Sequence, residues 1–356
     1  MRVAQFVSTS GLYGAERWVL GLLRHLDAAD QVLVTPSSDE PDLLEGARKQ
    51  GVRVRYLGET GNYAIVDAIR KLSALLVEER VDILHTHGYK SDIIGYFAAR
   101  KTGALVISTP HGWNFNRRGR KVALYETFDR WLLKRFDRVV PLSDIFAETL
   151  RGIPAERVTV INNFVDLDSL PPPKPGDRRL ISFVGRLVEL KRVHDLIEAL
   201  ARARCQDTRL QIIGDGPLRG ELAELTARLG LGGRVEFLGY REDRLDLLNR
   251  SGIFVLPSTT EEIPRSLMEA MGMRRVVIGT DIPGIRVLIR HGETGLLVPV
   301  GDPGRIAEAI DQVLNSEAEA DRMAERAGRL IEEGFSARAA ARTYGELYRE
   351  LMNGRG

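Results

Sequence analysis

A proline-rich run interrupts an otherwise regular alternation of strand and helix patterns in this chain. Residues 169–177 read Ser-Leu-Pro-Pro-Pro-Lys-Pro-Gly-Asp. Proline fixes φ and lacks an N–H group, so such a run cannot continue a helix or a central strand. A single core rarely serves more than about 250–300 residues, and this chain has 356. We therefore predict two domains, 1–170 and 180–335, joined by a linker at 171–179.

Short β-rich runs alternate with longer helical patterns on both sides of the linker, which is typical of parallel βαβ units. The strands predicted in the first half are 2–8, 31–35, 52–57, 83–86, 105–109 and 138–142, and the helices are 15–26, 42–50, 66–79, 90–101 and 122–135. The strands predicted in the second half are 180–184, 209–214, 235–238, 253–257 and 276–280, and the helices are 193–203, 218–229 and 267–271, followed by a helical tail. We expect an α/β protein with two Rossmann-like, doubly wound parallel sheets facing a central cleft. Ligands of such sheets bind beyond the carboxyl ends of the strands.

Charge and composition exclude several classes of protein. Lys and Arg number 51 against 49 for Asp and Glu, and a net charge of +2 provides no overall field for nucleic acid. The single cysteine, Cys205, cannot form an internal disulfide, which favours a reducing compartment. The apolar stretch at the start is too short for a secretory signal, and no run of about 18 apolar residues lacks a charge. We expect a cytoplasmic protein, or one at the inner face of the membrane, without a spanning helix.

Two glutamates, Glu261 and Glu269, flank a turn that directly follows the predicted strand 253–257. Pro264 can occupy the first helical position, which leaves free backbone N–H groups at a helix start. Such a helix end binds anions or sugar hydroxyls. The alternative is a capped helix with ordinary surface glutamates.

Two cations, Arg186 and Lys191, follow the predicted strand 180–184 and are five residues apart. Both can reach one pair of phosphates at the carboxyl edge of the sheet. The alternative is that both are solvated surface charges.

Glycine-rich turns occur in both halves. Residues 11–16, which include Tyr13 and Gly14, follow the first strand and open a helix, a weak signal that a tight turn also explains. The glycines at 214, 216 and 220 have the wrong spacing for a dinucleotide fingerprint, so we expect no NAD.

Three of the six histidines, His85, His87 and His111, lie at the carboxyl ends of predicted strands. That location favours function over core packing. Residues 85 and 87 share one face of a strand, but without a cysteine partner we do not favour a metal site.

Positive charge is concentrated between residues 101 and 138, where nine basic residues face three acidic ones. The segment contains Trp113, Arg117, Arg118, Arg120 and Lys121 and leads into a helix with Tyr125, Phe128, Trp131 and Leu132. A basic and aromatic segment suits anionic lipid headgroups or a lipid-diphosphate acceptor. The alternative is a solvated loop before a helix packed on the core. No nucleic-acid-binding module accompanies the segment, so we do not expect nucleic acid as a partner.

Taken in order along the chain, these features resemble the family 4 retaining glycosyltransferases of the GT-B fold. The mark of that family is a glutamate, seven residues and a second glutamate, which here are Glu261 and Glu269. Further motifs follow in the order of the family: Val184-Gly185-Arg186-Leu187 with Lys191, Ile213-Gly214-Asp215-Gly216-Pro217, Phe237-Leu238-Gly239, Thr280-Asp281 through Gly284-Ile285, and residues 291–299. The resemblance extends along nearly the whole chain. It implies that residues 336–356 form a helix that crosses back to the first domain.

For the second domain, the resemblance implies a site for a nucleotide sugar. Glu269 would hold the ribose, and Glu261 would face the donor sugar. Arg186 and Lys191 would contact the diphosphate and stabilise the charge that develops as the glycosidic bond breaks. The other predicted donor contacts are Gly214, Tyr240, Arg241, Ile263, Pro264, Arg265 and Ser266.

For the first domain, the resemblance implies contacts with the diphosphate, the donor sugar and the acceptor. Gly14 matches the second glycine of a Gly-Gly pair, and Tyr13 replaces the first and could narrow the acceptor site. His111 matches a histidine that approaches the donor sugar, and His87 is a second candidate on the acceptor side. The predicted catalytic set is His111, Glu261, Arg186 and Lys191.

Besides Tyr13, the chain departs from the family pattern at three places. Glu262 replaces a glycine after the first glutamate, and Arg192 replaces a glycine after Lys191. Residues 272–276, Gly-Met-Arg-Arg-Val, replace a pattern of small residues, Gly and Pro. The last change precedes a buried strand, where we expect it to affect packing.

The resemblance implies a metal-independent retaining hexosyltransferase without a cofactor. It would move a hexosyl unit from a nucleotide diphosphate sugar to a saccharide or lipid-linked acceptor, in bacterial-type cell-surface polysaccharide or glycolipid synthesis. The Pro264-Arg265-Ser266 form resembles members that build surface polysaccharide or O-antigen. Two alternatives are a non-catalytic GT-B subunit that binds a nucleotide sugar or glycan, and a nucleotide-sugar epimerase.

Overall fold

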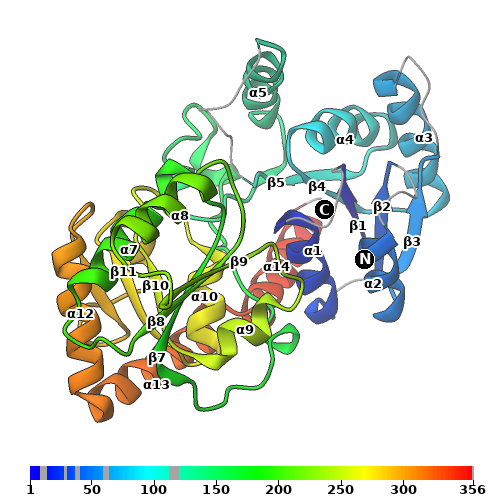
Figure 1. Cartoon of the computed structure of the whole chain (residues 1–356). Helices are drawn as coiled ribbons and strands as arrows, with labels where there is room; N and C mark the ends of the chain where they lie inside the picture. Colours follow the sequence, from blue (N-terminus) through cyan, green and yellow to red (C-terminus); the bar gives the residue numbers. More distant parts are fainter. Residues whose placement is uncertain (9–13, 28–29, 37–40, 59–63, 112–119, 355–356) are drawn as a thin grey trace. The chain divides into compact units, whose positions relative to one another are not determined.

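The chain folds into two compact units. The computed structural model describes residues 1–8, 14–27, 30–36, 41–58, 64–111 and 120–354 (Figure 1). The first unit comprises residues 1–163 together with 337–356, and the second comprises residues 164–336. The chain therefore enters and leaves the second unit once and completes the first unit with its last helix.

The first unit is built on a parallel sheet of six strands. Their order is β3-β2-β1-β4-β5-β6. The strands are β1 (Arg2–Val7), β2 (Asp30–Thr35), β3 (Arg53–Tyr56), β4 (Ile83–His87), β5 (Leu105–Thr109) and β6 (Arg138–Val139). The helices are α1 (Gly14–His25), α2 (Pro41–Lys49), α3 (Ala64–Glu78), α4 (Tyr89–Thr102), α5 (Arg120–Leu133), α6 (Asp144–Ala147) and α14 (Ala337–Asn353).

Helices cover both faces of this sheet, as in a doubly wound fold. One face carries α3, α4 and α5, whose apolar residues form a core with Ala4 and Phe6 of β1. Helices α1, α2 and α14 belong to the other layer, in which α1 contacts both α2 and α14 (Figure 1). Successive strand residues point to opposite faces, so Gln5, between Ala4 and Phe6, faces the layer of α1 and α14.

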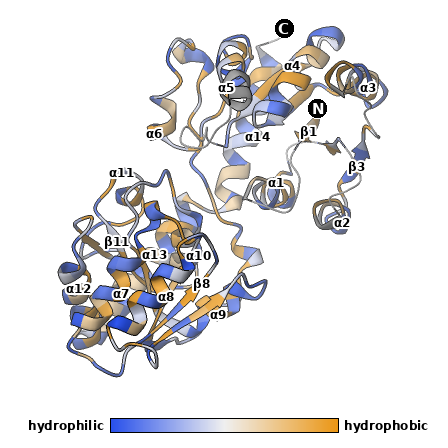
Figure 2. Cartoon of the chain, turned by 45° about the horizontal axis from the view of Figure 1, so that its top comes forward, coloured by the Kyte–Doolittle hydropathy of each residue, from blue (hydrophilic) through white to orange (hydrophobic). Residues whose placement is uncertain are grey.

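The second unit repeats the plan with the order β12-β11-β10-β7-β8-β9, again all parallel. Its strands are β7 (Asp177–Val184), β8 (Arg209–Ile213), β9 (Val235–Gly239), β10 (Ser251–Leu256), β11 (Val276–Thr280) and β12 (Leu296–Val298). Its helices are α7 (Val193–Arg202), α8 (Arg219–Arg228), α9 (Arg244–Arg250), α10 (Arg265–Gly272), α11 (Pro283–Arg286), α12 (Pro303–Asn315) and α13 (Glu317–Gly334), with a short 3₁₀ turn η3 (Glu189–Lys191). Helix α7 carries both hydrophilic and hydrophobic residues (Figure 2), and Leu196, Ile197 and Leu200 lie in the core.

Most predicted elements are present, with small shifts at their ends. Strand β6 is shorter than the predicted 138–142, although the Val140 N–H still donates to Ser108 O of β5 at 2.7 Å. Helix α9 and strand β12 were not predicted. Both are short, seven and three residues, and therefore show too little of a period to be recognised.

The proline-rich run lies inside the second unit, not between the units as predicted. The units divide at residues 163 and 164, and β7 already begins at Asp177, within the predicted linker 171–179. The backbone of the run is held by side chains: Asn249 Nδ2 donates to Pro172 O at 3.0 Å, and Arg275 Nη2 donates to Lys174 O at 2.6 Å. Arg275, one of the departures from the family pattern, also donates to the carbonyls of Asn249, Ser251 and Met273. Its role is to fasten this run to the sheet.

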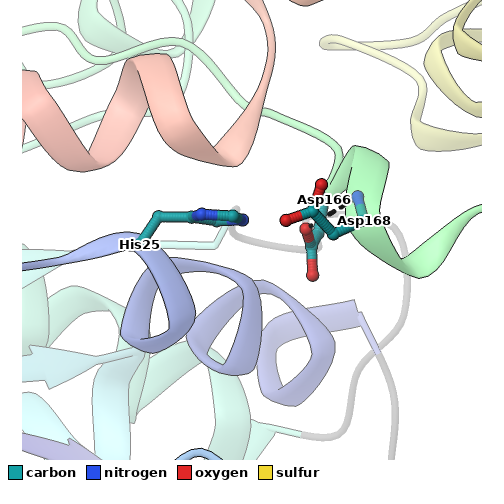
Figure 3. Close-up of side chains that lie close together, drawn as sticks. All are labelled: His25, Asp166 and Asp168. Atoms are coloured by element: carbon teal, nitrogen blue, oxygen red, sulfur yellow. Dashed lines mark hydrogen bonds between the residues drawn. The ribbon is translucent and has the colours of Figure 1, made fainter.

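The segments that enter and leave the second unit lie side by side. The Val165 N–H donates to Phe335 O at 2.9 Å. The next turn, η2 (Leu167–Ser169), is capped by Asp166, whose Oδ1 accepts from the Asp168 N–H at 3.2 Å (Figure 3). His25, also labelled in Figure 3, ends helix α1 of the first unit.

A buried carboxyl group in the first unit gives the fold a pH dependence. Asp92 of α4 is fully buried, and its Oδ1 accepts a hydrogen bond from the Thr86 hydroxyl. Burial, and then the neighbouring carboxyl of Asp129, raise the pKa of Asp92 well above its usual range. The folded protein therefore keeps a proton that the unfolded chain releases above its ordinary pKa of about 3.9. Because the folded state binds more protons there, this group lowers stability as the pH rises.

We predict that Asp92→Asn stabilises the protein, and does so more at pH 8 than at pH 5. Asparagine has the shape of the protonated carboxyl group but cannot ionise. The measurement is urea unfolding of both proteins at the two pH values. A gain at pH 8 that does not exceed the gain at pH 5 would contradict the assignment.

Candidate functional site

Two glycine-containing loops pack against each other at the carboxyl ends of β7 and β8. The Gly185 N–H donates to Ile213 O at 3.0 Å, and the Leu187 N–H donates to Asp215 O at 2.9 Å. Gly214 has a φ of 141°, and a Cβ there would collide with the Gly185 carbonyl. The close approach of the loops therefore requires glycine at 214, whatever ligand it also contacts.

Arg186 lies on the first of these loops and is exposed. Among the residues that the structure describes, its guanidinium has no hydrogen-bond or ion-pair partner. It is therefore available to an anion at this edge of the sheet.

Lys191 and Glu261 are brought together although they are 70 residues apart in the sequence. The Lys191 ammonium forms an ion pair with Glu261 Oε1, and the Ser258 hydroxyl donates to the same oxygen at 2.7 Å. The backbone also joins the two loops, because the Thr259 N–H donates to Leu190 O at 2.9 Å. Lys191 ends η3, directly after the loop of Arg186.

The backbone conformation of Arg192 explains why a glycine suits the position after Lys191. Its φ of 45° lies in the left-handed region, which glycine adopts without strain. Here the arginine is held by a double contact with Asp195, with Nε at 2.5 Å from Oδ2 and Nη2 at 3.0 Å from Oδ1. The side-chain ion pair thus accompanies a backbone conformation that is unfavourable for arginine.

Glu269 is a buried carboxylate held by two arginines. It is 1% exposed. Arg244 of α9 contacts both oxygens, with Nη1 at 2.5 Å from Oε2 and Nη2 at 2.9 Å from Oε1, and Arg265 Nε lies 3.0 Å from Oε1. Burial alone would raise the pKa of Glu269, but the hydrogen bonds and charges of Arg244 and Arg265 outweigh it and lower the pKa. The carboxylate is therefore ionised at neutral pH.

The segment between the two glutamates packs closely against helix α11. Pro264 is the residue that precedes α10, with extended backbone, and not the first helical residue as predicted; Arg265 takes that position. Ile263 and Pro264 are buried and Ser266 is partly exposed. Gly284 of α11 packs so closely on the Glu261 and Glu262 carbonyls that a Cβ would collide with both.

Tyr240 and Arg241 follow β9 at the same carboxyl edge of the sheet. Tyr240 is 72% exposed. Arg241 is paired with Asp243, with contacts of 2.7 and 2.6 Å. Burial opposes the charged form of Arg244, but the hydrogen bond and charge of Glu269, followed by the nearby Tyr240, raise the pKa of Arg244 overall.

Arg244 is the site residue that sequence reasoning missed. It lies 25 residues before Glu269, on the short helix that was not predicted. The signal that could have indicated it is general: a buried carboxylate requires a cationic partner. The spacing of four residues in a helix identifies Arg265 as one partner, but it does not identify Arg244.

In the first unit, the histidines at the carboxyl ends of the strands form one cluster. His85 and His87 are buried, and His111 is partly buried. His87 Nδ1 lies 3.3 Å from His111 Nε2, and His87 Nε2 lies 2.9 Å from Gln5 Oε1. Both nitrogens of His87 are therefore used inside the unit, which corrects the expectation that it lies on the acceptor side. Burial lowers the pKa of His111 to about 4, so the ring is neutral at pH 7.

The structure describes only some of the remaining residues that were predicted to contact the donor or the acceptor. Gly14 begins α1, as the glycine turn predicted. Tyr13, Trp113, Arg117 and Arg118 lie outside the described residues, and Arg120 and Lys121 begin α5 with side chains that are not described.

Helix α5 nevertheless presents aromatic rings to solvent. Phe128 and Trp131 are 39% and 47% exposed and stack on each other at 5.5 Å, and the Arg135 guanidinium lies 3.6 Å from the Trp131 ring centre. Leu132 and Leu133 of the same helix are buried. The expectation of a helix packed on the core thus holds for one face only. No helix in the described part of the chain is long and apolar enough to cross a membrane.

Sequence comparisons identify the family. The family model described as "Glycosyltransferase Family 4" matches residues 13–169, and the model described as "Glycosyl transferases group 1" matches residues 167–330. A galactosyltransferase of Escherichia coli, UDP-Gal:alpha-D-GlcNAc-diphosphoundecaprenol alpha-1,3-galactosyltransferase, is 30% identical over 68% of this chain and 70% of its own. N-acetyl-alpha-D-glucosaminyl L-malate synthase of Bacillus anthracis is 28% identical over 79% of this chain and 78% of its own.

Solved structures agree on the fold. HepE of Anabaena, solved in complex with UDP, superposes with a TM-score of 0.83 at 20% identity and covers 98% of this chain and 100% of its own. Sucrose-phosphate synthase of Thermosynechococcus elongatus superposes with a TM-score of 0.79 at 21% identity, over 99% and 100% of the two chains. The fold is GT-B, and the chain belongs to the group 1 glycosyltransferases.

The buried ion pair between Arg244 and Glu269 gives a prediction for stability. Breaking a buried pair leaves an uncompensated charge and typically costs about 3–5 kcal/mol. We predict a loss of this order for Arg244→Met, and a smaller loss for Arg244→Met combined with Glu269→Leu, measured by denaturant unfolding. Arg241→Met, which breaks an exposed pair, is the control and should cost about 0–1 kcal/mol. A loss in the double variant equal to the sum of the losses measured for Arg244→Met and for Glu269→Leu alone would contradict a direct interaction.

Proposed function

We propose that the protein is a retaining hexosyltransferase that uses a nucleotide diphosphate sugar and needs no metal ion. The acceptor is a saccharide or a lipid-linked saccharide of bacterial-type surface polysaccharide or glycolipid synthesis. The observation that carries the proposal is the ionised carboxylate of Glu269 in α10, which follows Glu261, the partner of Lys191, by eight residues. The solved relative that holds UDP and the relative that carries a UDP-galactose name support a nucleotide sugar as donor substrate.

Glu269 retains capacity for a ribose. An ionised carboxylate accepts about four hydrogen bonds. Arg244 and Arg265 use two positions on Oε1 and one on Oε2. A hydroxyl of the ribose can therefore donate to Oε2 while the arginines keep the group ionised and oriented.

Arg186 and Lys191 supply positive charge where the diphosphate departs. Arg186 is free among the described residues, and Lys191 can turn from Glu261 toward a phosphate. Negative charge grows on the diphosphate as the glycosidic bond breaks, so these cations stabilise the transition state more than the ground state. The leaving phosphate then takes the proton of the acceptor hydroxyl on the same face of the sugar, which preserves the anomeric configuration. Neutral His111 orients a sugar hydroxyl.

Substitution of Arg186 tests this account without disturbing the fold, because its side chain has no described partner. We predict that Arg186→Ala lowers kcat of transfer about 10²- to 10³-fold, the usual effect of removing one transition-state contact, with an unchanged Tm. Arg329→Ala, an exposed arginine on α13, is the control. Release of the nucleoside diphosphate is followed with a panel of UDP-, GDP- and dTDP-sugars. Full activity of Arg186→Ala, or of Glu269→Ala, would contradict the proposed donor site.

Product analysis in the same assay separates the alternatives. An epimerase converts the nucleotide sugar without an acceptor, and a non-catalytic subunit binds it without any turnover.

We further propose that α5 brings the enzyme to an anionic membrane surface. The exposed Phe128 and Trp131 suit the headgroup region of a bilayer, and the basic residues from 117 to 121 add attraction to anionic lipid. A lipid-linked acceptor lies at such a surface.

Vesicle binding tests this part of the proposal. We predict that the protein sediments with vesicles containing 30% phosphatidylglycerol and that Phe128→Ser with Trp131→Ser weakens binding at least about tenfold, because inserting one large apolar side chain contributes about 1.5–3 kcal/mol. Tyr56→Ser on β3, an aromatic that is 53% exposed in the same unit, is the control. Equal binding of all three proteins would exclude α5 as the contact.

A further inference from the structure

A chain of hydrogen bonds runs through the interior of the first unit and ends on His111. Its members are Gln5 of β1, His85 and His87 of β4, Thr109 of β5, and Tyr344 and Tyr348 of α14, all of them buried, together with His111. The register pairs Gln5 with His85 and His87 with Thr109 across the parallel strands. Residues of the same face of neighbouring strands thus meet under α14, which places their polar groups within reach of its two tyrosines.

The direction of the chain is set at Gln5, because the two ends of its amide differ. Gln5 Nε2 donates to Tyr348 Oη at 3.2 Å, so Gln5 Oε1 faces His87 Nε2 at 2.9 Å. A carbonyl oxygen only accepts, so His87 carries its proton on Nε2. Neutral His87 then has a lone pair on Nδ1, and His111 Nε2, 3.3 Å away, must donate to it.

The hydrogen bonds that lead from Gln5 through Tyr348 to Tyr344 are consistent with the same direction. Tyr348 Oη accepts from Gln5, which leaves its own proton available to His85 Nδ1 at 2.7 Å. His85 Nε2 then donates to Thr109 Oγ1 at 2.8 Å, and the Thr109 hydroxyl donates to Tyr344 Oη at 3.0 Å. Every ring is neutral in this arrangement. Burial, followed by the nearby His111, lowers the pKa of His85 to about 3.

We infer that Gln5, His87 and Tyr348 are positioning residues that hold His111 in the tautomer with its proton on Nε2. His111 Nδ1 then carries a lone pair, and the described residues give it no partner. It accepts from a ligand hydroxyl and cannot donate to a ligand oxygen. The inference rests on the proposed function only for the identity of that ligand, a hydroxyl of the donor sugar.

The direction of all the hydrogen bonds in the network depends on one group, the side-chain amide of Gln5. If the Gln5 amide turned over, every bond along the chain would reverse, and His111 would carry its proton on Nδ1. In the observed arrangement the Tyr348 hydroxyl supplies the acceptor for Gln5 Nε2, and its removal leaves that N–H group without this partner. Tyr344 is a matched control on the same helix, since it is also buried but, within the described part of the chain, has no hydrogen bond with Gln5 and is linked to it only through Thr109, His85 and Tyr348.

The test is nitrogen-15 NMR of the histidine rings at pH 7.5 in three proteins: wild type, Tyr348→Phe and Tyr344→Phe. The six histidines give few signals, and His111→Gln assigns those of residue 111. We expect His111 of the wild type and of Tyr344→Phe to show an unprotonated Nδ1 and a protonated Nε2. In Tyr348→Phe we expect both shifts to move toward the average of the two tautomers.

Two results would overturn the inference. One is a wild-type His111 that carries its proton on Nδ1. The other is a Tyr348→Phe spectrum that matches that of Tyr344→Phe at residue 111. If Tyr348→Phe does not fold, Gln5→Met removes the same link and is judged by the same criterion.

The spectra require no donor substrate, so they decide the tautomer even if the proposed function fails. In transfer assays, Tyr348→Phe should lower kcat/KM at least tenfold more than Tyr344→Phe. An equal loss in both variants, with the tautomers as expected, would count against the proposed role of His111 but not against its tautomer.

Discussion

The second unit depends on one electrostatic constraint: the buried carboxylate of Glu269 must remain ionised. Glu269 stays ionised because Arg244 and Arg265 together make three contacts with its two oxygens. The constraint ties two elements together, because α9 supplies one arginine and α10 supplies both the other arginine and the glutamate. A group that is desolvated and charged in advance binds a polar ligand without first reorganising. The orientation of the carboxylate is therefore determined by the fold.

The first unit also orients buried polar groups, but it does so without charged side chains. Between the strands β1, β4 and β5 and helix α14 it holds histidines, a glutamine, a threonine and tyrosines in one neutral network. Burial lowers the pKa of each histidine in it, so hydrogen bonds replace ion pairs as the source of orientation. Both units thus place polar groups at the same edge of the same kind of sheet, one ionised and one neutral. The last helix is part of this arrangement, because α14 supplies the tyrosines.

Sequence reasoning predicted the parts of this fold that depend on repeated local patterns. Strands β5 and β11 have the predicted bounds, and most other elements end within a few residues of their predictions. The short elements α9 and β12 could not be recognised, and the missing α9 concealed Arg244. The proline run marked a break in periodicity, but its position in the second unit follows from Asn249 and Arg275, whose side chains reach its carbonyls from distant segments. Likewise, the burial of His87 follows from packing, since its place at a strand end is equally compatible with an exposed role.

The central claim is that a nucleotide sugar binds at the carboxyl edge of the second sheet, and amide hydrogen exchange measures this most directly. The probe is UDP, with GDP and dTDP in parallel, followed by mass spectrometry of peptides from the whole chain. Binding should slow exchange in the loop from Gly185 to Lys191, in the segment from Glu261 to Ser266 and at the start of α9, while the opposite edge around Asp177 stays unchanged. Protection confined to the first unit, or to the amino ends of β7 and β10, would contradict the account.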